Sequence, residues 1–118
     1  MGWTQWKKLA TAREWYPENI EYSEAACYEL GIRGKWKHFV IQTYVGNTGN
    51  LKMRMTQYAR NGSHLHKIVS KYWKYDYTLW YRYFPLSSKQ KAENMEKELL
   101  DKFGLEKYPW NTYLGSSK

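Results

Sequence analysis

The stretch YVGNTGNLKMRMTQY, residues 44–58, joins the end of a predicted strand, a polar turn and the start of a predicted helix. Residues 39–45 are rich in β-branched and aromatic types, which favours a strand, and the glycines and asparagines that follow tolerate turn geometry. Asn50 is a residue type that caps helices, and the apolar residues after it share one helical face. The stretch therefore predicts a strand, a turn and a helix in immediate succession.

Arg54 and Tyr58 lie four residues apart, so they are neighbours on the surface of this predicted helix. Because the helix begins where the strand stops, it brings both side chains back beside Tyr44. Two phenols and one guanidinium then gather in one place, and the fixed fork of a guanidinium suits the recognition of a phosphate. The stretch looks like the centre of a site that cuts phosphodiester bonds.

The rest of the chain supplies further elements at regular intervals. Hydrophobic periodicity and turn residues predict a hairpin over 25–45 that turns near 33–35, a helix from Ser63 to about Trp73, a strand over 75–84, and a helix capped by Ser87 or Ser88 that runs to Phe103. The expected fold class is α/β (α+β), with a small, mainly antiparallel three-stranded sheet flanked by helices.

Two parts of this scheme make specific structural predictions. Tyr28 and Tyr44 lie on the same face of the hairpin only if the residue numbers of two paired residues add up to an even number. Residues 7–14 permit a helix that Pro17 ends, and Trp3 and Trp6 are expected to pack as one ridge on the domain rather than to stack on bases.

The net charge of +8 is unevenly distributed. The span from Arg33 to Lys91 holds twelve Lys or Arg residues and one acid, Asp76, whereas most acids lie towards the two ends of the chain. A concentrated basic field of this kind attracts a polyanion and releases its counterions. The residues expected to contact a nucleic acid within this field are Lys52, Arg60, Lys67 and Lys71.

Length and composition fit one small folded domain over residues 1–118, in which 1–24 is an N-terminal extension. Apolar runs long enough for a membrane span are missing, and the N-terminus lacks the apolar block of a signal peptide. Cys27 is the only cysteine, which excludes an intrachain disulfide and fits a reducing compartment. We therefore expect a cytoplasmic protein without a membrane partner or a small-molecule cofactor.

The central stretch resembles a known nuclease motif. Tyr44-Val45-Gly46, a polar turn, Asn50-Leu51, an arginine ten residues after the tyrosine and a tyrosine four residues after the arginine are similar to the second half of the GIY-YIG endonuclease motif. The resemblance covers 25–112, places the first family tyrosine at Tyr28, and identifies the downstream glutamate, paired aliphatics, proline and asparagine with Glu96, Leu99-Leu100, Pro109 and Asn111. The chain departs from the family at Ala26-Cys27, where a glycine and a branched aliphatic are usual, and at Asn47, where a lysine is frequent.

The resemblance implies a metal-dependent DNA endonuclease with a single-metal site. Glu96 would bind one Mg²⁺ or Mn²⁺, with Glu93 as the alternative ligand. Either ion is a hard cation that prefers carboxylate oxygens and several waters as ligands. Arg54 would clamp the scissile phosphate. Asn111 would orient the site near the metal.

The tyrosines have the remaining roles in this scheme. Tyr44, together with Tyr28, would position or deprotonate the attacking water, and Tyr58 would hydrogen-bond the phosphate or the water. A free phenol with a pKa near 10 is a poor base, so it stays open whether a tyrosine or the metal ion activates the water. A single active site nicks one strand at a time, so the protein acts as a monomer or as a transient homodimer on DNA.

Two alternative functions remain open at this stage. A GIY-YIG-like domain could bind nucleic acid without cutting it, and the departures from the family motif favour that alternative. A small RNA-binding module would use the aromatic strand 75–84 and predicts that Tyr77, Trp80 and Tyr81 are exposed. His64 and His66 are not expected to bind a transition metal, because no cysteine or acid near them in sequence completes a site. They are expected to be ordinary surface histidines, with a supporting phosphate contact by one of them as the alternative.

Overall fold

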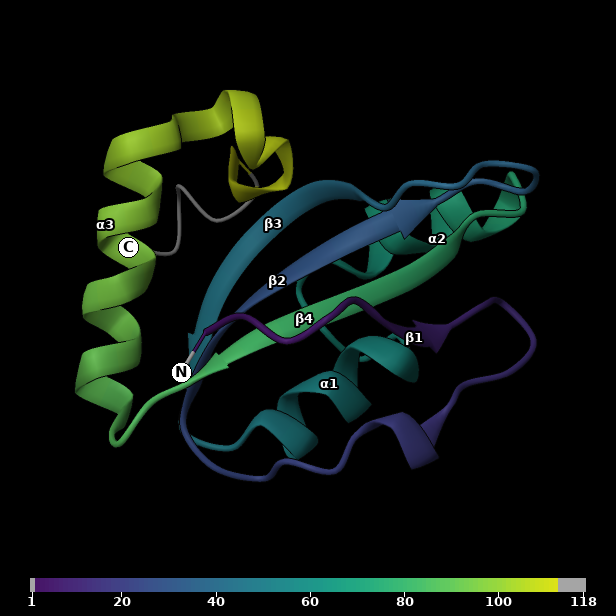
Figure 1. Cartoon of the computed structure of the whole chain (residues 1–118). Coiled ribbons are helices and arrows are strands. Elements are labelled where there is room, and N and C mark those ends of the chain that lie inside the picture. The colour runs from purple at the N-terminus through teal and green to yellow at the C-terminus, as the bar shows by residue number, and fades with distance from the viewer. Residues whose placement is uncertain (1, 113–118) are drawn as a thin grey trace.

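The computed structural model describes residues 2–112 and contains one antiparallel sheet with helices around it (Figure 1). In chain order the elements are β1 (Lys7–Ala10), a short 3-10 helix η1 (Pro17–Asn19), β2 (Ala26–Arg33), β3 (Ile41–Thr48), α1 (Leu51–Ala59), α2 (His66–Lys74), β4 (Thr78–Pro85) and α3 (Lys89–Lys107). The strand order is β1-β4-β2-β3. The expected α+β class is confirmed, with four strands in the sheet in place of three.

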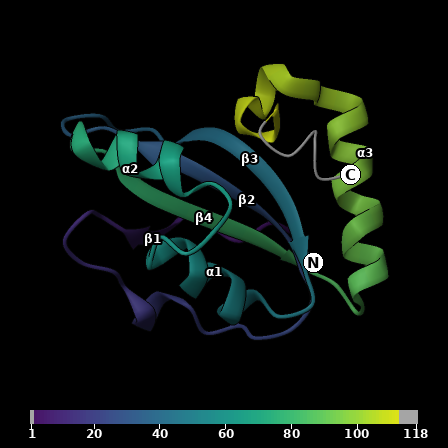
Figure 2. The same cartoon turned by 180° about the vertical axis from the view of Figure 1, so that it is seen from behind.

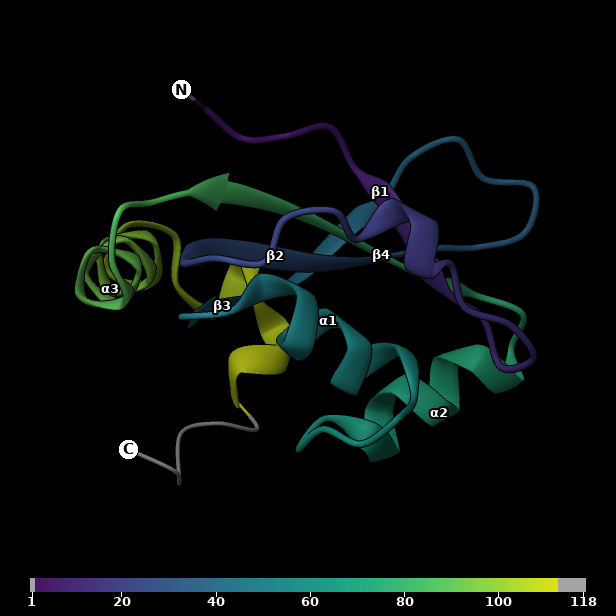
Figure 3. The ribbon, with the colours of Figure 1, turned by 90° about the horizontal axis from the view of Figure 1, so that it is seen from below.

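Side chains of β2 alternate between two hydrophobic clusters. Even-numbered residues such as Tyr28 and Leu30 pack with residues of α1 and α2, and odd-numbered Cys27 packs with residues of α3. α1 and α2 lie together in front of the sheet in the view from behind (Figure 2). Figure 3 shows both helices below the sheet and α3 beside one end of it.

The hairpin of β2 and β3 puts two of the predicted tyrosines on one face. Tyr28 pairs with Gly46 and Leu30 pairs with Tyr44, so the numbers of paired residues sum to an even value. Both phenol rings therefore point towards α1, as the register argument requires.

The N-terminal segment differs from its sequence-based prediction. Residues 7–10, expected to permit a helix, form β1, which pairs with β4 at the edge of the sheet. The Arg82 guanidinium lies over the rings of both Trp3 and Trp6, at 4.9 and 4.8 Å from Cζ to the ring centroids. Arg82 in turn donates to the buried carboxylate of Glu29. The two tryptophans therefore pack on the domain, as expected.

Several boundaries also differ from the prediction. β3 continues through Gly46 to Thr48, a segment expected to be a turn, because its backbone pairs with the start of β2. α2 begins at His66 rather than Ser63, whose hydroxyl accepts from the backbone of Leu65 in the preceding turn. The caps at Asn50 and Ser88 are confirmed by side-chain hydrogen bonds to Met53 N and Lys91 N.

The aromatic strand β4 does not present the surface that an RNA-binding module would use. Tyr81 is fully buried, and its hydroxyl donates to the backbone oxygen of Asn19. Tyr77 and Trp80 are partly buried, and the Arg33 guanidinium covers the Trp80 ring. This burial argues against base stacking on 75–84.

Candidate active site

Three tyrosines and one arginine from three elements meet beneath the sheet. Tyr28 of β2, Tyr44 of β3 and Tyr58 of α1 have ring centroids between 5.9 and 6.4 Å apart. The Tyr28 and Tyr58 hydroxyls share a hydrogen bond of 2.7 Å, and Arg54 Nε donates to the Tyr28 hydroxyl over 3.4 Å. The phenols and the guanidinium that the sequence indicated are therefore brought together.

Gly46 makes room for this cluster. It lies opposite Tyr28 in the β2–β3 pairing, and a Cβ atom at this position would lie 2.5 Å from the Tyr28 hydroxyl and 2.6 Å from its ring. Carbon atoms in ordinary contact are roughly 3.5–4.0 Å apart. The Tyr28 ring can therefore lie over β3 only because residue 46 has no side chain.

His64 joins the cluster from the turn that precedes α2. Its Nδ1 lies 3.2 Å from an Arg54 terminal nitrogen, and its Nε2 lies 3.4 Å from the Tyr44 hydroxyl. A guanidinium can only donate, so Nδ1 accepts, and the neutral ring carries its proton on Nε2, directed at Tyr44. The expectation that His64 is an ordinary surface histidine omitted these two contacts.

Burial controls the protonation of these groups. Desolvation raises the pKa of Tyr28, Tyr44 and Tyr58, and neighbouring phenols raise it further. Burial and the charge of Arg54 lower the pKa of His64. At neutral pH the three phenols are therefore protonated donors, while the imidazole is neutral.

Glu96 approaches the cluster from the other side of β3. It lies on α3, is 8% exposed, and accepts from Asn47 Nδ2 over 2.5 Å. Its carboxylate also contributes to the raised pKa of Tyr44, after burial and Tyr28. The alternative acid Glu93 is exposed and pairs with Lys89 over 3.2 Å. Glu96, rather than Glu93, is therefore the acid that contacts β3 and acts electrostatically on Tyr44.

The donor set at Glu96 fits a hard cation held mainly by water. Among residues 2–112, no three His, Cys, Asp or Glu side chains gather in a way that could enclose a metal ion. Mg²⁺ does not need such a cage, because it keeps several waters and is commonly held through one or two carboxylates and the substrate phosphate. One buried carboxylate, fixed by an amide, satisfies that requirement.

Asn111 binds the backbone of β3 rather than another side chain. Its Oδ1 accepts from Val45 N over 3.0 Å, and its Nδ2 donates to Val45 O over 2.9 Å. These bonds pair the backbone groups of Val45 on the outer edge of β3, next to Tyr44, where no further strand of residues 2–112 pairs. They also fasten the end of the described chain to the strand that carries Tyr44 and Asn47.

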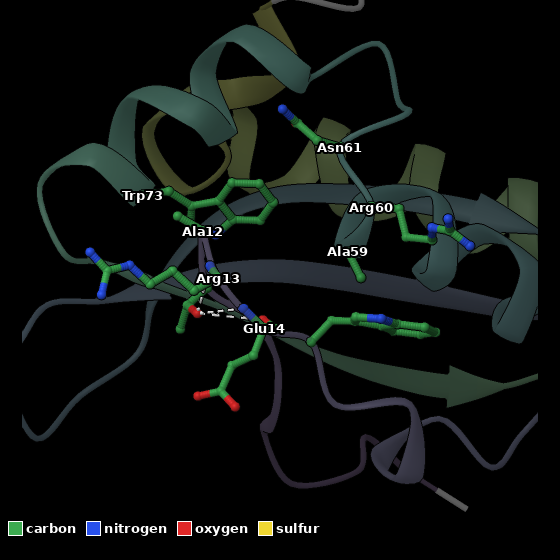
Figure 4. Close-up of a pocket in the computed structure, with 9 residues that line it drawn as sticks. Ala12, Arg13, Glu14, Ala59, Arg60, Asn61 and Trp73 are labelled. Atoms are coloured by element: carbon green, nitrogen blue, oxygen red, sulfur yellow. Dashed lines mark hydrogen bonds between the residues drawn. The ribbon is translucent and has the colours of Figure 1, made fainter.

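The four basic residues expected to bind nucleic acid are exposed and lie on or beside α1 and α2. Lys52 lies in the first turn of α1, and Lys67 and Lys71 lie one turn apart on α2. Arg60 follows α1 and lines a hollow of about 620 Å³ between the segment 11–15, the end of α1 and Trp73 (Figure 4).

Comparison with known proteins identifies the family. The model of the GIY-YIG domain-containing proteins matches residues 3–118, nearly the whole chain. No curated protein and no solved structure matches this chain. Within the part of the chain that the structure describes, no helix combines the length and apolar character needed to cross a lipid bilayer. Because the family model extends over almost every residue, including β1 to β4 and all three helices, the chain belongs to the GIY-YIG nuclease family.

Proposed function

We propose that this protein is a divalent metal-dependent DNA endonuclease that hydrolyses phosphodiester bonds at the cluster of Tyr28, Tyr44, Arg54, Tyr58 and Glu96. Members of its family are generally nucleases that act on DNA and depend on a divalent metal. The observation that supports the proposal most strongly is the convergence of a half-buried arginine and three buried phenols from β2, β3 and α1.

Arg54 is the phosphate-binding group in this proposal. Its guanidinium donates hydrogen bonds to Tyr28, Gln57 and His64. A phosphate oxygen can replace any of these three acceptors or accept a further bond beside them. A pentavalent transition state carries more negative charge on its oxygens than the ground state does. A fixed cation beside it therefore stabilises the transition state selectively.

Tyr44 orients the attacking water. Its hydroxyl oxygen accepts from His64 Nε2, so its own hydrogen is directed away from the histidine, towards a water or a phosphate oxygen. The hydroxyls of Tyr28 and Tyr58 share a 2.7 Å hydrogen bond, and the Tyr28 hydroxyl also accepts from Arg54 Nε. These bonds fix the orientation of Arg54. None of the three phenols ionises readily at neutral pH, because burial raises their pKa values.

The residue that would hold the metal is Glu96, positioned by Asn47. When bound there, Mg²⁺ or Mn²⁺ supplies the positive charge that lowers the pKa of a water and neutralises charge on the phosphate. Asn47 stands where the family frequently has a lysine, so its amide supplies a hydrogen bond to Glu96 in place of a positive charge.

Nicking of supercoiled plasmid tests this function. The wild-type protein should relax the plasmid in Mg²⁺ and not in excess chelator. Glu96→Gln should lose at least about 100-fold of the rate, which corresponds to about 2.7 kcal/mol. Glu93→Gln is the matched control on the same helix and should retain wild-type activity, because Glu93 is exposed and pairs with Lys89 rather than with Asn47.

Two results would contradict the proposal. Equal nicking by the wild type and Glu96→Gln would show that the activity does not come from this site. Binding of DNA without any nicking would favour a member of the family that binds nucleic acid and does not cut it.

A further inference from the structure

The loop between β2 and β3 exposes aromatic side chains that the candidate active site does not use. It comprises residues 34–40, GKWKHFV, and is called the aromatic loop below. Trp36 is 86% exposed and Phe39 is 81% exposed, the two highest values among the large hydrophobic side chains in the described part of the chain. Side chains of this size are seldom left in water without a partner.

The loop forms one wall of an open hollow. The hollow has a volume of about 450 Å³, within the size range of roughly 300–1,000 Å³ that ligand sites occupy. It is lined by Gly34, Trp36, Lys37, His38, Phe39, Ile41 and Tyr77. The rings of Trp36, Phe39 and Tyr77 and the cationic side chain of Lys37 thus line a single depression.

The aromatic loop is positively charged. Arg33, Lys35 and Lys37 lie in or beside the loop, and no Asp or Glu occurs between Glu29 and Asp76 in the sequence. Lys35 Nζ lies 5.7 Å from the centroid of the Trp36 ring. A group that stacks on this indole therefore has an ammonium beside it, which suits a nucleobase attached to a phosphate.

The aromatic loop is remote from the tyrosine cluster. Figure 1 shows it at the end of the sheet opposite α3, and Figure 3 shows it on the side away from α1 and α2. Five residues of β2 separate Tyr28 from Arg33 at the base of the loop, or roughly 17 Å of strand. This length equals about five stacked nucleotides, so a DNA strand that reached the loop would do so outside the site that cuts.

We propose that the aromatic loop is a second DNA-binding site, which stacks Trp36 and Phe39 on unpaired bases. Base pairs inside a duplex do not offer their faces, whereas unpaired nucleotides at a flap, gap or junction do. The assignment of DNA as the ligand rests on the proposed nuclease function. The substrate class that follows is DNA with a single-stranded segment next to a duplex.

Binding measured in chelator tests this proposal without any cleavage. The probes are a fluorescent oligothymidine of about 12 nucleotides and a blunt duplex of the same length, followed by anisotropy. The double variant Trp36→Ala/Phe39→Ala should lose at least about 10-fold in affinity for the single strand, since each stacked base contributes roughly that factor. Its affinity for the blunt duplex should stay within about twofold of the wild type.

Two further variants make the result specific. Trp36→Tyr keeps an aromatic face and should retain most of the wild-type affinity for the single strand. Phe103→Ala is the matched control, because Phe103 is another exposed aromatic ring that two lysines flank, on α3 and away from the loop. It should bind both probes as the wild type does.

Three outcomes would overturn the proposal. Unchanged affinity of the double variant for oligothymidine would show that the loop does not stack on bases. An equal loss on both probes would show a general contact with DNA rather than recognition of unpaired nucleotides. Loss of binding to anionic phosphatidylserine vesicles, with DNA binding unchanged, would identify a membrane surface instead. Failure of plasmid nicking would refute the nuclease function alone, because none of these binding measurements depends on cleavage.

Discussion

Replacing Gly46 with alanine should disrupt the tyrosine cluster from within. The new Cβ would lie 2.5 Å from the Tyr28 hydroxyl and 3.0 Å from Tyr44 Cε2, so the Tyr28 ring has to move by about 1 Å to reach ordinary contact distance. Tyr28 is 1% exposed and has little space in which to move. Such a shift would break its 2.7 Å bond to Tyr58.

The expected cost follows from these contacts. Overpacking of a buried site costs about 1–3 kcal/mol, and the loss of a buried hydrogen bond costs about 1–3 kcal/mol. Alanine gains about 0.5–1 kcal/mol over glycine within a strand. Gly46→Ala should therefore lower the free energy of unfolding by about 1–5 kcal/mol.

Urea unfolding followed by tryptophan fluorescence measures this change. Gly49→Ala is the matched control from the same stretch, because its new Cβ meets only the Lys89 side chain at 3.7 Å or more. Adding Tyr28→Phe to Gly46→Ala removes the atom of closest approach and should recover part of the loss. A Gly46→Ala protein within 0.5 kcal/mol of the wild type would refute the account of how Tyr28 packs on β3.

Three further predictions concern the groups around the cluster. Asn111→Ala should lower the free energy of unfolding by about 2–4 kcal/mol in urea, because it leaves the buried backbone groups of Val45 without their two partners; an unchanged value would contradict that. Tyr28, Tyr44 and Tyr58 have pKa values raised above 10, so their contribution to stability is complete below pH 10 and is lost as the pH rises beyond it. Absorbance at 295 nm should accordingly show these phenols ionising only as the protein unfolds, and ionisation near pH 10 in the folded state would exclude their burial. NMR titration should give His64 a midpoint below 6.5 that moves up in Arg54→Ala, whereas a midpoint that does not respond to Arg54 would exclude their contact.

Local patterns in the sequence were sufficient to predict most of the fold. The helix from Leu51, the hairpin of β2 and β3 and the helix from Lys89 follow from periodicity and capping residues that lie within each element. β1 was not predicted, because a four-residue strand has little periodicity of its own and forms only by pairing with β4, some seventy residues later in the chain. Gly46 and Asn47 were predicted to form a turn for the same reason, because their strand conformation depends on pairing with β2.

The candidate site shows a similar division. Tyr44, Arg54 and Tyr58 are linked by short-range spacing, and the structure brings them together. His64 reaches the cluster only because the turn after α1 folds back, and no spacing rule predicts that path. Asn47 could have been noted as the residue after the family glycine, although its bond to Glu96 requires knowledge of where α3 lies. The catalytic and DNA-binding roles given to these residues stay predictions.

The measurement that tests the central claim most directly is the single-turnover rate at which excess protein cuts a labelled duplex in Mg²⁺. The wild type should cut, and Glu96→Gln should bind the same duplex with unchanged affinity yet cut at least about 100-fold more slowly. Glu93→Gln should match the wild type in both binding and rate. Cleavage by Glu96→Gln at the wild-type rate would contradict the assignment of the metal and the chemistry to this site.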